Sequence, residues 1–172
     1  MYISCQLDNG NTMYCYKDTT NDIRFKILDN AGTSVSSALI TTYTASKIIA
    51  VQKLSNGNVL IVYTTDYPLK YQIYDQTGTV VKAEGASLDT SIAADNGSST
   101  LLSNGNIFIA YNSTGSYGSK FLICDQTGTK VVNPTSFNPA GALSCISTCE
   151  LNNGNIIITY EKADKGYFVI YS

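Results

Sequence analysis

Carboxylates are the side chains of this sequence best suited to acid–base or nucleophilic chemistry, because the chain has no histidine. Without histidine, Ser-His-Asp and Cys-His nucleophiles and the commonest general base are missing. The glutamates are Glu84, Glu150 and Glu161, and nothing in their spacing places two of them at the separation that glycoside hydrolysis needs. Gly-rich phosphate-binding motifs are also missing. The sequence therefore predicts a protein that is not an enzyme and that needs no cofactor.

Metal and disulfide chemistry finds little support among the five cysteines. Cys145 and Cys149 are four residues apart on a predicted strand, which separates them by ~13 Å, too far for a disulfide. The stretch from Asp8 to Asn11 has some residues of a calcium loop but lacks the full ligand series and the distal glutamate. We expect no metal site, and we expect the cysteines to be small buried hydrophobic residues: Cys5, Cys15, Cys124, Cys145 and Cys149.

The patterns of charge and hydropathy exclude nucleic-acid binding and membrane insertion. The formal net charge is −2, from 11 basic and 13 acidic residues, and Arg24 is the single arginine. No basic stripe is present that would bind nucleic acid, and no run of ~18 apolar residues is present that would insert into a membrane. The compartment is not readable from the sequence, although an extracellular or virion surface suits this composition best.

One motif, Leu-x-Asn-Gly-Asn, occurs four times, with its glycines 47, 48 and 49 residues apart. Each copy is followed by an apolar run that ends in a tyrosine, and we expect these tyrosines to pack between sheets: Tyr16, Tyr63, Tyr111 and Tyr160. Asn-Gly is the favoured pair of a type I′ hairpin turn. The motif therefore predicts four tight turns, at Asn9 and Gly10, Asn56 and Gly57, Asn104 and Gly105, and Asn153 and Gly154.

Each copy continues with an aromatic-x-Ile segment, and three copies then carry Asp-x-x-Gly. We expect each of these aspartates to cap its own turn through side-chain to backbone hydrogen bonds. The turns run from Asp29 to Gly32, from Asp75 to Gly78 and from Asp125 to Gly128.

The repeat predicts an all-β fold built from units of about four strands. The second strand of the second unit, Val59 to Thr64, is apolar without alternation, which indicates that both of its faces are covered. We expect a single repeat domain over 1–172, with repeats at 1–46, 47–94, 95–142 and 143–172, of which the last is incomplete.

These four-stranded repeats resemble β-propeller blades, and their strand order resembles that of WD-repeat blades, although the Gly-His and Trp-Asp signatures of that family are absent. The resemblance covers the whole chain and implies a fold but no activity. The Asp-x-x-Gly-Thr turn also resembles the Asp-box of sialidases, from which it departs by one residue. Sialidases need three arginines, so the single Arg24 argues against that activity.

The fourth copy stops before the expected turn and outer strand, which leaves three arrangements open. In the first, one chain closes a four-bladed ring. In the second, two chains form an eight-bladed ring. In the third, the repeats form an open or polymeric array or are part of a longer repeat protein. An uncovered last strand would recruit a partner strand, so we expect self-association through the incomplete terminal blade.

Two functions remain after these exclusions. The first is a non-catalytic structural or interaction module of a surface or extracellular assembly, such as a fibre, a coat or a virion appendage. The alternative is a glycan-binding, lectin-like propeller, in which exposed aromatic rings stack on sugars. The candidate ligand-binding residues are Tyr67, Tyr117 and Tyr167.

Overall fold

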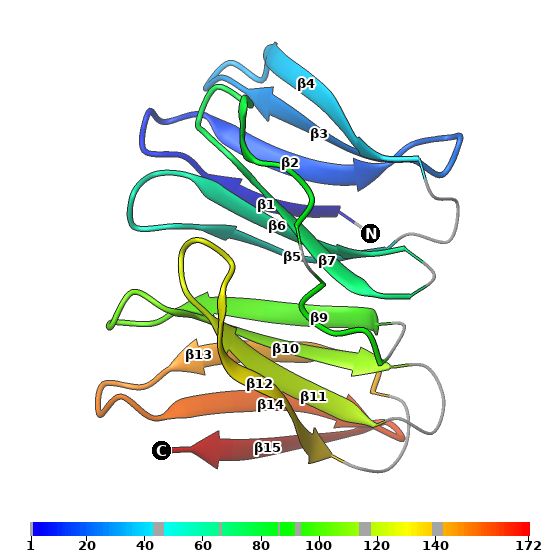
Figure 1. Cartoon of the computed structure of the whole chain (residues 1–172), viewed down its shortest axis with the longest axis vertical. Coiled ribbons are helices and arrows are strands. Elements are labelled where there is room, and N and C mark those ends of the chain that lie inside the picture. The colour runs from blue at the N-terminus through cyan, green and yellow to red at the C-terminus, as the bar shows by residue number, and fades with distance from the viewer. Residues whose placement is uncertain are drawn as a thin grey trace.

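The computed structural model describes residues 2–42, 47–65, 67–85, 87–91, 94–113, 118–138 and 143–172. These residues form fifteen strands in four antiparallel sheets (Figure 1). In every sheet, neighbouring strands follow one another in the chain. Within the described ranges, we find no helix with the length and apolar character needed to cross a membrane.

The first three sheets have four strands each and the fourth has three. The first sheet contains β1 (Tyr2–Gln6), β2 (Thr12–Lys17), β3 (Ile23–Leu28) and β4 (Ser34–Thr41). The second contains β5 (Lys47–Lys53), β6 (Val59–Thr64), β7 (Leu69–Tyr74) and β8 (Val80–Lys82). The third contains β9 (Ala94–Leu101), β10 (Ile107–Ser113), β11 (Ser119–Cys124) and β12 (Lys130–Asn138). The fourth contains β13 (Ile146–Glu150), β14 (Ile156–Lys162) and β15 (Lys165–Tyr171).

The Asn-Gly turns differ from the type I′ geometry that the sequence predicts. In the turn between β5 and β6, the Gly57 N–H donates to the Leu54 carbonyl at 3.1 Å, and the Leu54 N–H donates to the Asn58 carbonyl at 2.8 Å. Gly57 has a φ of 83°, whereas Asn56 is not among the residues with positive φ. This is a type I turn followed by a glycine bulge. Asn56 suits it because its side-chain oxygen accepts the Asn58 N–H at 3.0 Å.

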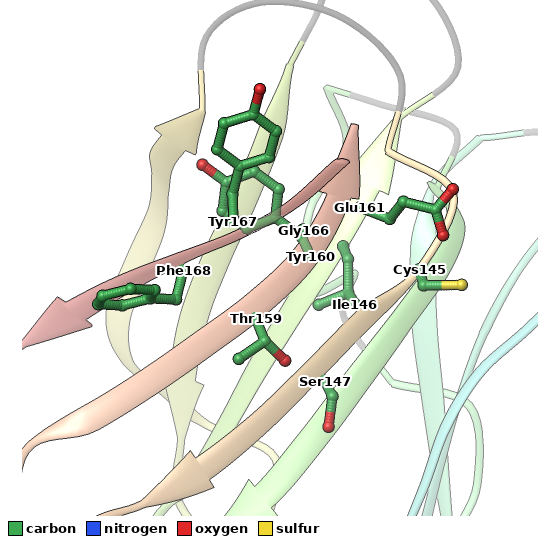
Figure 2. Close-up of a pocket in the computed structure, with 9 residues that line it drawn as sticks. All are labelled: Cys145, Ile146, Ser147, Thr159, Tyr160, Glu161, Gly166, Tyr167 and Phe168. Carbon is green, nitrogen blue, oxygen red and sulfur yellow. The ribbon is translucent and has the colours of Figure 1, made fainter. Parts of the chain in front are cut away.

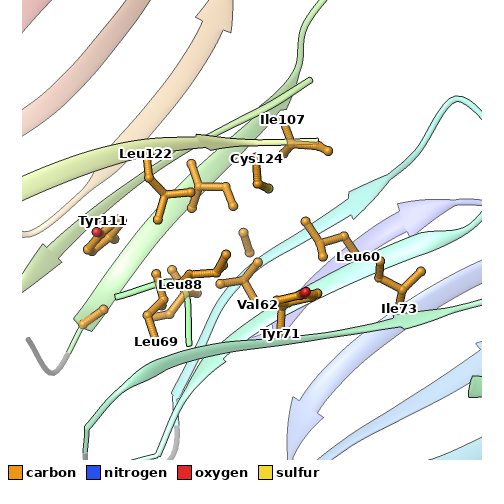
Figure 3. Packing of buried hydrophobic residues seen from close by; sticks show 14 of the residues in the cluster. Leu60, Val62, Leu69, Tyr71, Ile73, Leu88, Ile107, Tyr111, Leu122 and Cys124 are labelled. Atoms are coloured by element: carbon orange, nitrogen blue, oxygen red, sulfur yellow. The ribbon is translucent and has the colours of Figure 1, made fainter. Parts of the chain in front are cut away.

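The sheets pack face to face in one row, with their first strands, β1, β5, β9 and β13, next to one another along the row (Figure 1). All six side chains of β6 are buried, as its continuous apolar pattern predicts. Ile61 and Tyr63 pack against the first sheet, while Leu60 and Val62 pack against the third (Figure 3). Because fully burying one large apolar side chain contributes about 1.5–3 kcal/mol, these contacts between sheets are the main stabilising term of the fold.

The row is open. The first and fourth sheets lie at opposite ends of the long axis of the molecule, so the four sheets do not close a ring within this chain (Figure 1). The fourth sheet pairs β15 only with β14, and no described strand lies on its other side. The predicted architecture, all-β with four sheets of which the last lacks an outer strand, is confirmed.

Candidate functional site

Of the three tyrosines predicted to contact a ligand, the two that the structure describes, Tyr67 and Tyr167, do not lie together. Tyr67 follows β6 in the second sheet and is 60% exposed. Tyr167 lies on β15, where its ring stacks on that of Tyr160 with centroids 5.6 Å apart. The third sheet separates Tyr67 from Tyr167 (Figure 1). Tyr117 lies outside the described residues.

Each sheet has two ends with different chemistry. At the turn end, a tight turn joins the first strand to the second, and another joins the third to the fourth. At the loop end, the second strand passes to the third, and the chain crosses to the next sheet. Three aspartates of the turn end are engaged within their own turns: Asp75 Oδ1 accepts the N–H groups of Thr77 and Thr79 at 2.8 and 2.9 Å, and Asp29 and Asp125 accept the equivalent N–H groups. Asp8, also at the turn end, instead contacts the Lys53 ammonium of the second sheet. The loop end holds a further group of carboxylates.

In the first sheet, the loop-end carboxylate is Asp18, in the hairpin between β2 and β3. The Arg24 Nε donates to Asp18 Oδ2 at 2.5 Å, and the Thr20 hydroxyl donates to Asp18 Oδ1 at 2.7 Å. Hydrogen bonds from Thr20 and Arg24 hold the pKa of Asp18 at about 2. Arg24 lies opposite Tyr16 in the strand register.

In the second sheet, the loop-end carboxylate is Glu84, which follows β8. The Tyr63 hydroxyl donates to Glu84 Oε2 at 2.8 Å, and the Lys70 ammonium contacts Glu84 Oε1. Desolvation acts to raise the pKa of Glu84, but the bonds from Lys70 and Tyr63 outweigh it and leave this pKa below its ordinary value. The Glu84 side chain is 35% exposed, so solvent and solutes reach it.

In the third sheet, the Tyr111 hydroxyl donates at 2.9 Å to Asp89 Oδ2, which belongs to the segment leaving the second sheet. The Lys120 ammonium lies 3.4 Å from the same oxygen. Burial acts to raise the pKa of Asp89, but hydrogen bonds from Ser91 and Tyr111, together with the charge of Lys120, lower it overall. Asp89 is only 5% exposed and is closed to a ligand.

The three sets share one plan: a strand-ending tyrosine, a cation opposite it on the next strand, and a carboxylate bonded to the cation. In the fourth sheet, Tyr167 occupies the position of the cation, opposite Tyr160. From the sequence, the recurrent tyrosines were predicted to pack between sheets, and these sets were not predicted. The available signal was the basic residue at the same register position in three repeats: Arg24, Lys70 and Lys120.

Chemically, these sets hold ionised carboxylates next to neutral phenols. Burial and the neighbouring carboxylate raise the pKa of Tyr63 and that of Tyr111, so both hydroxyls remain proton donors. Glu84 combines this environment with exposure, and it is therefore the described carboxylate best placed to act as a base or nucleophile. In the described part of the chain, no cluster of three or more Cys, Asp or Glu residues could hold a metal ion.

A hollow with a volume of about 310 Å³ runs across the first strands of three sheets. Its walls are Tyr2 and Ile3 on β1, residues 49–51 on β5 and residues 97–99 on β9. Gly97 lets the second and third sheets approach closely here, because a Cβ at this position would lie 2.6 Å from Cγ2 of Ile49 on β5. No charged side chain lines this hollow, so it offers shape and hydroxyl groups but no acid or base.

Comparison with known proteins identifies the fold. No protein-family model and no curated protein matches the chain. A solved protein of unknown function from Dyadobacter fermentans is similar with a TM-score of 0.70 and 13% identity over 99% of this chain and 64% of that one. An α-L-arabinofuranosidase from Clostridium thermocellum is similar with a TM-score of 0.62 and 11% identity, over 97% of this chain and 65% of that one. The intramolecular trans-sialidase from Ruminococcus gnavus is similar with a TM-score of 0.58 and 13% identity, over 98% of this chain and 42% of that one.

These likenesses show that the four sheets are β-propeller-type blades. The chain spans less than two thirds of the length of each of these solved proteins. The comparisons contradict two predictions made from the sequence, that of a non-catalytic structural or lectin-like module and that of a protein without enzymatic activity, since named propellers of this fold are enzymes. The prediction rested on the missing histidine and on the lack of two glutamates at a suitable spacing, but glycoside hydrolysis needs no histidine, and spacing along the sequence does not report which carboxylates the fold brings together.

Proposed function

We propose that the chain is part of a β-propeller hydrolase that cleaves glycosidic bonds of neutral sugars, with Glu84 as its unprotonated carboxylate. The observation that carries this proposal is the environment of Glu84 at the loop end. One of its oxygens contacts the Lys70 ammonium, the other accepts the Tyr63 hydroxyl, and the side chain stays partly exposed. Both partners favour the ionised form that a nucleophile or general base requires.

The reaction class follows from the residues that the chain offers. Glycoside hydrolysis is performed by carboxyl groups and needs no histidine, and this chain has none. The arabinofuranosidase and the trans-sialidase that share the fold are both named as enzymes of sugars, which supports a sugar substrate. Both of these enzymes are longer than this chain, so we propose glycoside hydrolysis for this chain and do not transfer it from them.

The neutral character of the substrate follows from the cations. Arg24 is the single arginine and is engaged with Asp18 at 2.5 Å. No other guanidinium is available to bind the carboxylate of an acidic sugar in a bidentate manner. We therefore expect uncharged pentoses or hexoses as substrates.

The test is hydrolysis of a panel of p-nitrophenyl glycosides of arabinose, xylose, galactose and glucose. We expect the wild-type chain to cleave at least one of them, and Glu84→Gln to lower kcat by at least about 100-fold. Glu150→Gln is the matched control, because Glu150 lies at the turn end, where it accepts the Ser103 N–H. Wild-type protein inactive on the whole panel, or equal activity of Glu84→Gln, would overturn the proposal.

A separate proposal concerns the type of propeller blade that the four sheets resemble. The strand order and the aspartate that begins each turn between third and fourth strands support the resemblance to WD-repeat blades.

A further inference from the structure

The outward side of the fourth sheet is an uncovered apolar surface. Phe168 is 66% exposed and Ile170 is 46% exposed, and the surface includes a hollow with a volume of about 420 Å³ (Figure 2). In the strand register, Thr159 lies opposite Phe168, and Ile157 opposite Ile170, so these side chains form one continuous face. We call it the tail face, made of Cys145, Ser147, Cys149, Ile157, Thr159, Phe168 and Ile170, with the charged Glu161 on the same side of β14 at the loop end.

The same positions of the third sheet are covered by the next sheet. Counted from the Asn-Gly turn, the tail-face residues Ile157, Thr159, Phe168 and Ile170 correspond to Phe108, Ala110, Phe121 and Ile123. Phe108 and Ala110 are fully buried and pack against the fourth sheet. The ring of Phe121 lies 4.7 Å from that of Tyr171. The tail face is thus one half of an interface that recurs within the chain.

The opposite end of the row carries the other half. We call it the head face, made of the outward residues Thr12, Tyr14, Tyr16 and Leu28 of the first sheet. The cations Arg24 and Lys26 share this side of the sheet, and the Lys26 ammonium lies 5.8 Å from the centre of the Tyr16 ring. Thr12, Tyr14, Tyr16 and Leu28 occupy the register positions of Ile156, Ile158, Tyr160 and Tyr171, against which the third sheet packs. Tyr14 and Tyr16 stack with ring centroids 5.2 Å apart and remain partly exposed. Large, preordered aromatic surface of this kind suits a protein interface.

We propose that the tail face of one chain binds the head face of a second copy, so that the row of sheets continues from one molecule into the next. In this contact, Phe168 packs on Leu28 and Tyr14 of the second copy, as Phe121 packs on Tyr171 and Ile158 within the chain. The second copy is the occupant because one chain carries both halves of an interface that it already forms three times between its own sheets. A head-to-tail contact closes a ring or builds a filament. This inference stands independently of the proposed function.

The first test measures mass by light scattering and sedimentation over a range of protein concentrations. We expect the wild-type chain to assemble, Phe168→Asp to weaken assembly by at least about tenfold, and Val131→Asp to assemble as the wild type does. Val131 is the matched control, because it is 56% exposed on β12, away from both end faces. A wild-type chain that stays monomeric at high concentration, or a Val131→Asp variant that is equally impaired, overturns the proposal. Circular dichroism of each variant verifies that it folds.

A mixing experiment separates the head-to-tail arrangement from contact between like faces. Phe168→Asp removes the tail face, and Tyr14→Glu removes the head face, so each variant alone should be monomeric. Their mixture should give a 1:1 dimer, because one intact head and one intact tail remain. Assembly of Tyr14→Glu alone would mean contact between two tail faces and would overturn the proposal.

The chain carries its own reporters of this surface. Cys145 and Cys149 are exposed on the tail face, whereas Cys15 and Cys124 are buried. Labelling of Cys145 and Cys149 by a maleimide, located by mass spectrometry, should slow as wild-type protein is concentrated and should not slow in Phe168→Asp. Equal slowing in both proteins would contradict the proposal.

Discussion

The Tyr111 hydroxyl in the third sheet donates a hydrogen bond to the Asp89 carboxylate of the segment that leaves the second sheet, with 2.9 Å between the two oxygens. This bond joins the third sheet to the segment that leaves the second, next to the apolar packing between these two sheets. Tyr63 makes a similar bond to Glu84, which follows β8 of its own sheet. A strand-ending tyrosine thus packs through its ring and fixes a loop-end carboxylate through its hydroxyl.

Removal of the Tyr111 hydroxyl should destabilise the fold. In Tyr111→Phe, the buried Asp89 carboxylate loses a donor, and we expect the free energy of unfolding to fall by about 1–3 kcal/mol. Tyr67→Phe is the control, because Tyr67 is 60% exposed. Urea unfolding at pH 7 measures both variants. Equal stability of Tyr111→Phe and wild type would show that the bond contributes nothing.

The stability of the protein should fall in acid. The pKa of Asp89 and that of Glu84 lie below their ordinary values in the folded chain. A carboxyl whose pKa is lower in the folded than in the unfolded state stabilises the fold above the unfolded pKa, and this contribution is lost as the pH falls through the folded pKa. We therefore expect the free energy of unfolding to decline below about pH 4. Asp89→Asn should decline less steeply over the same range, and an identical slope would refute this assignment.

Two turn glycines should differ sharply in their tolerance of a methyl group. Gly32 and Gly128 occupy the same turn position and have φ values of 80° and 78°. A Cβ at Gly128 would lie 2.1 Å from the Tyr71 ring, whereas a Cβ at Gly32 would meet nothing within 4 Å. Both alanine variants incur the positive-φ penalty of about 1–2 kcal/mol, and Gly128→Ala should lose about 1–3 kcal/mol more through overpacking. Thermal unfolding compares them, and equal losses would contradict the close contact with Tyr71.

Two phenylalanines at equivalent positions should contribute differently to the free energy of unfolding, because only one of them is buried. Phe121 and Phe168 occupy the same register position in successive sheets, but Phe121 is 8% exposed and Phe168 is 66% exposed. In dilute protein, Phe121→Ala should lower the free energy of unfolding by about 3–5 kcal/mol, while Phe168→Ala should change it by less than about 0.5 kcal/mol. Similar losses in urea unfolding would mean that the tail face is covered within the monomer.

The sequence predicts the sheets well because their determinants are local. The recurring Leu-x-Asn-Gly-Asn motif locates the turns, and the unbroken apolar run from Val59 to Thr64 indicates a strand covered on both faces. The turn type is harder to predict, because Asn-Gly suits two geometries. The bond from the Asn58 N–H to the Asn56 side chain, visible only in three dimensions, accompanies the type I turn with a glycine bulge.

The candidate site was less predictable for a different reason. Tyr63 and Tyr111 occupy repeated positions, but their carboxylate partners Glu84 and Asp89 lie in the connection between sheets, where the spacing varies.

Ring closure depends on the small rotation between successive sheets, which the volumes of facing side chains set. Composition and periodicity do not report that rotation, so the open row was only one of three alternatives.

The open row can be tested most directly by the distance between its two ends. Spin labels on the native Cys149 and on Ser4→Cys, with Cys145 replaced by serine, mark the first strands of the fourth and first sheets. Packed sheets lie about 10 Å apart, so three spacings along the row predict a separation of about 30 Å in dilute protein. A distance near 10 Å would mean that the first and fourth sheets touch in a closed four-sheet ring, and it would contradict both the architecture and the two uncovered end faces.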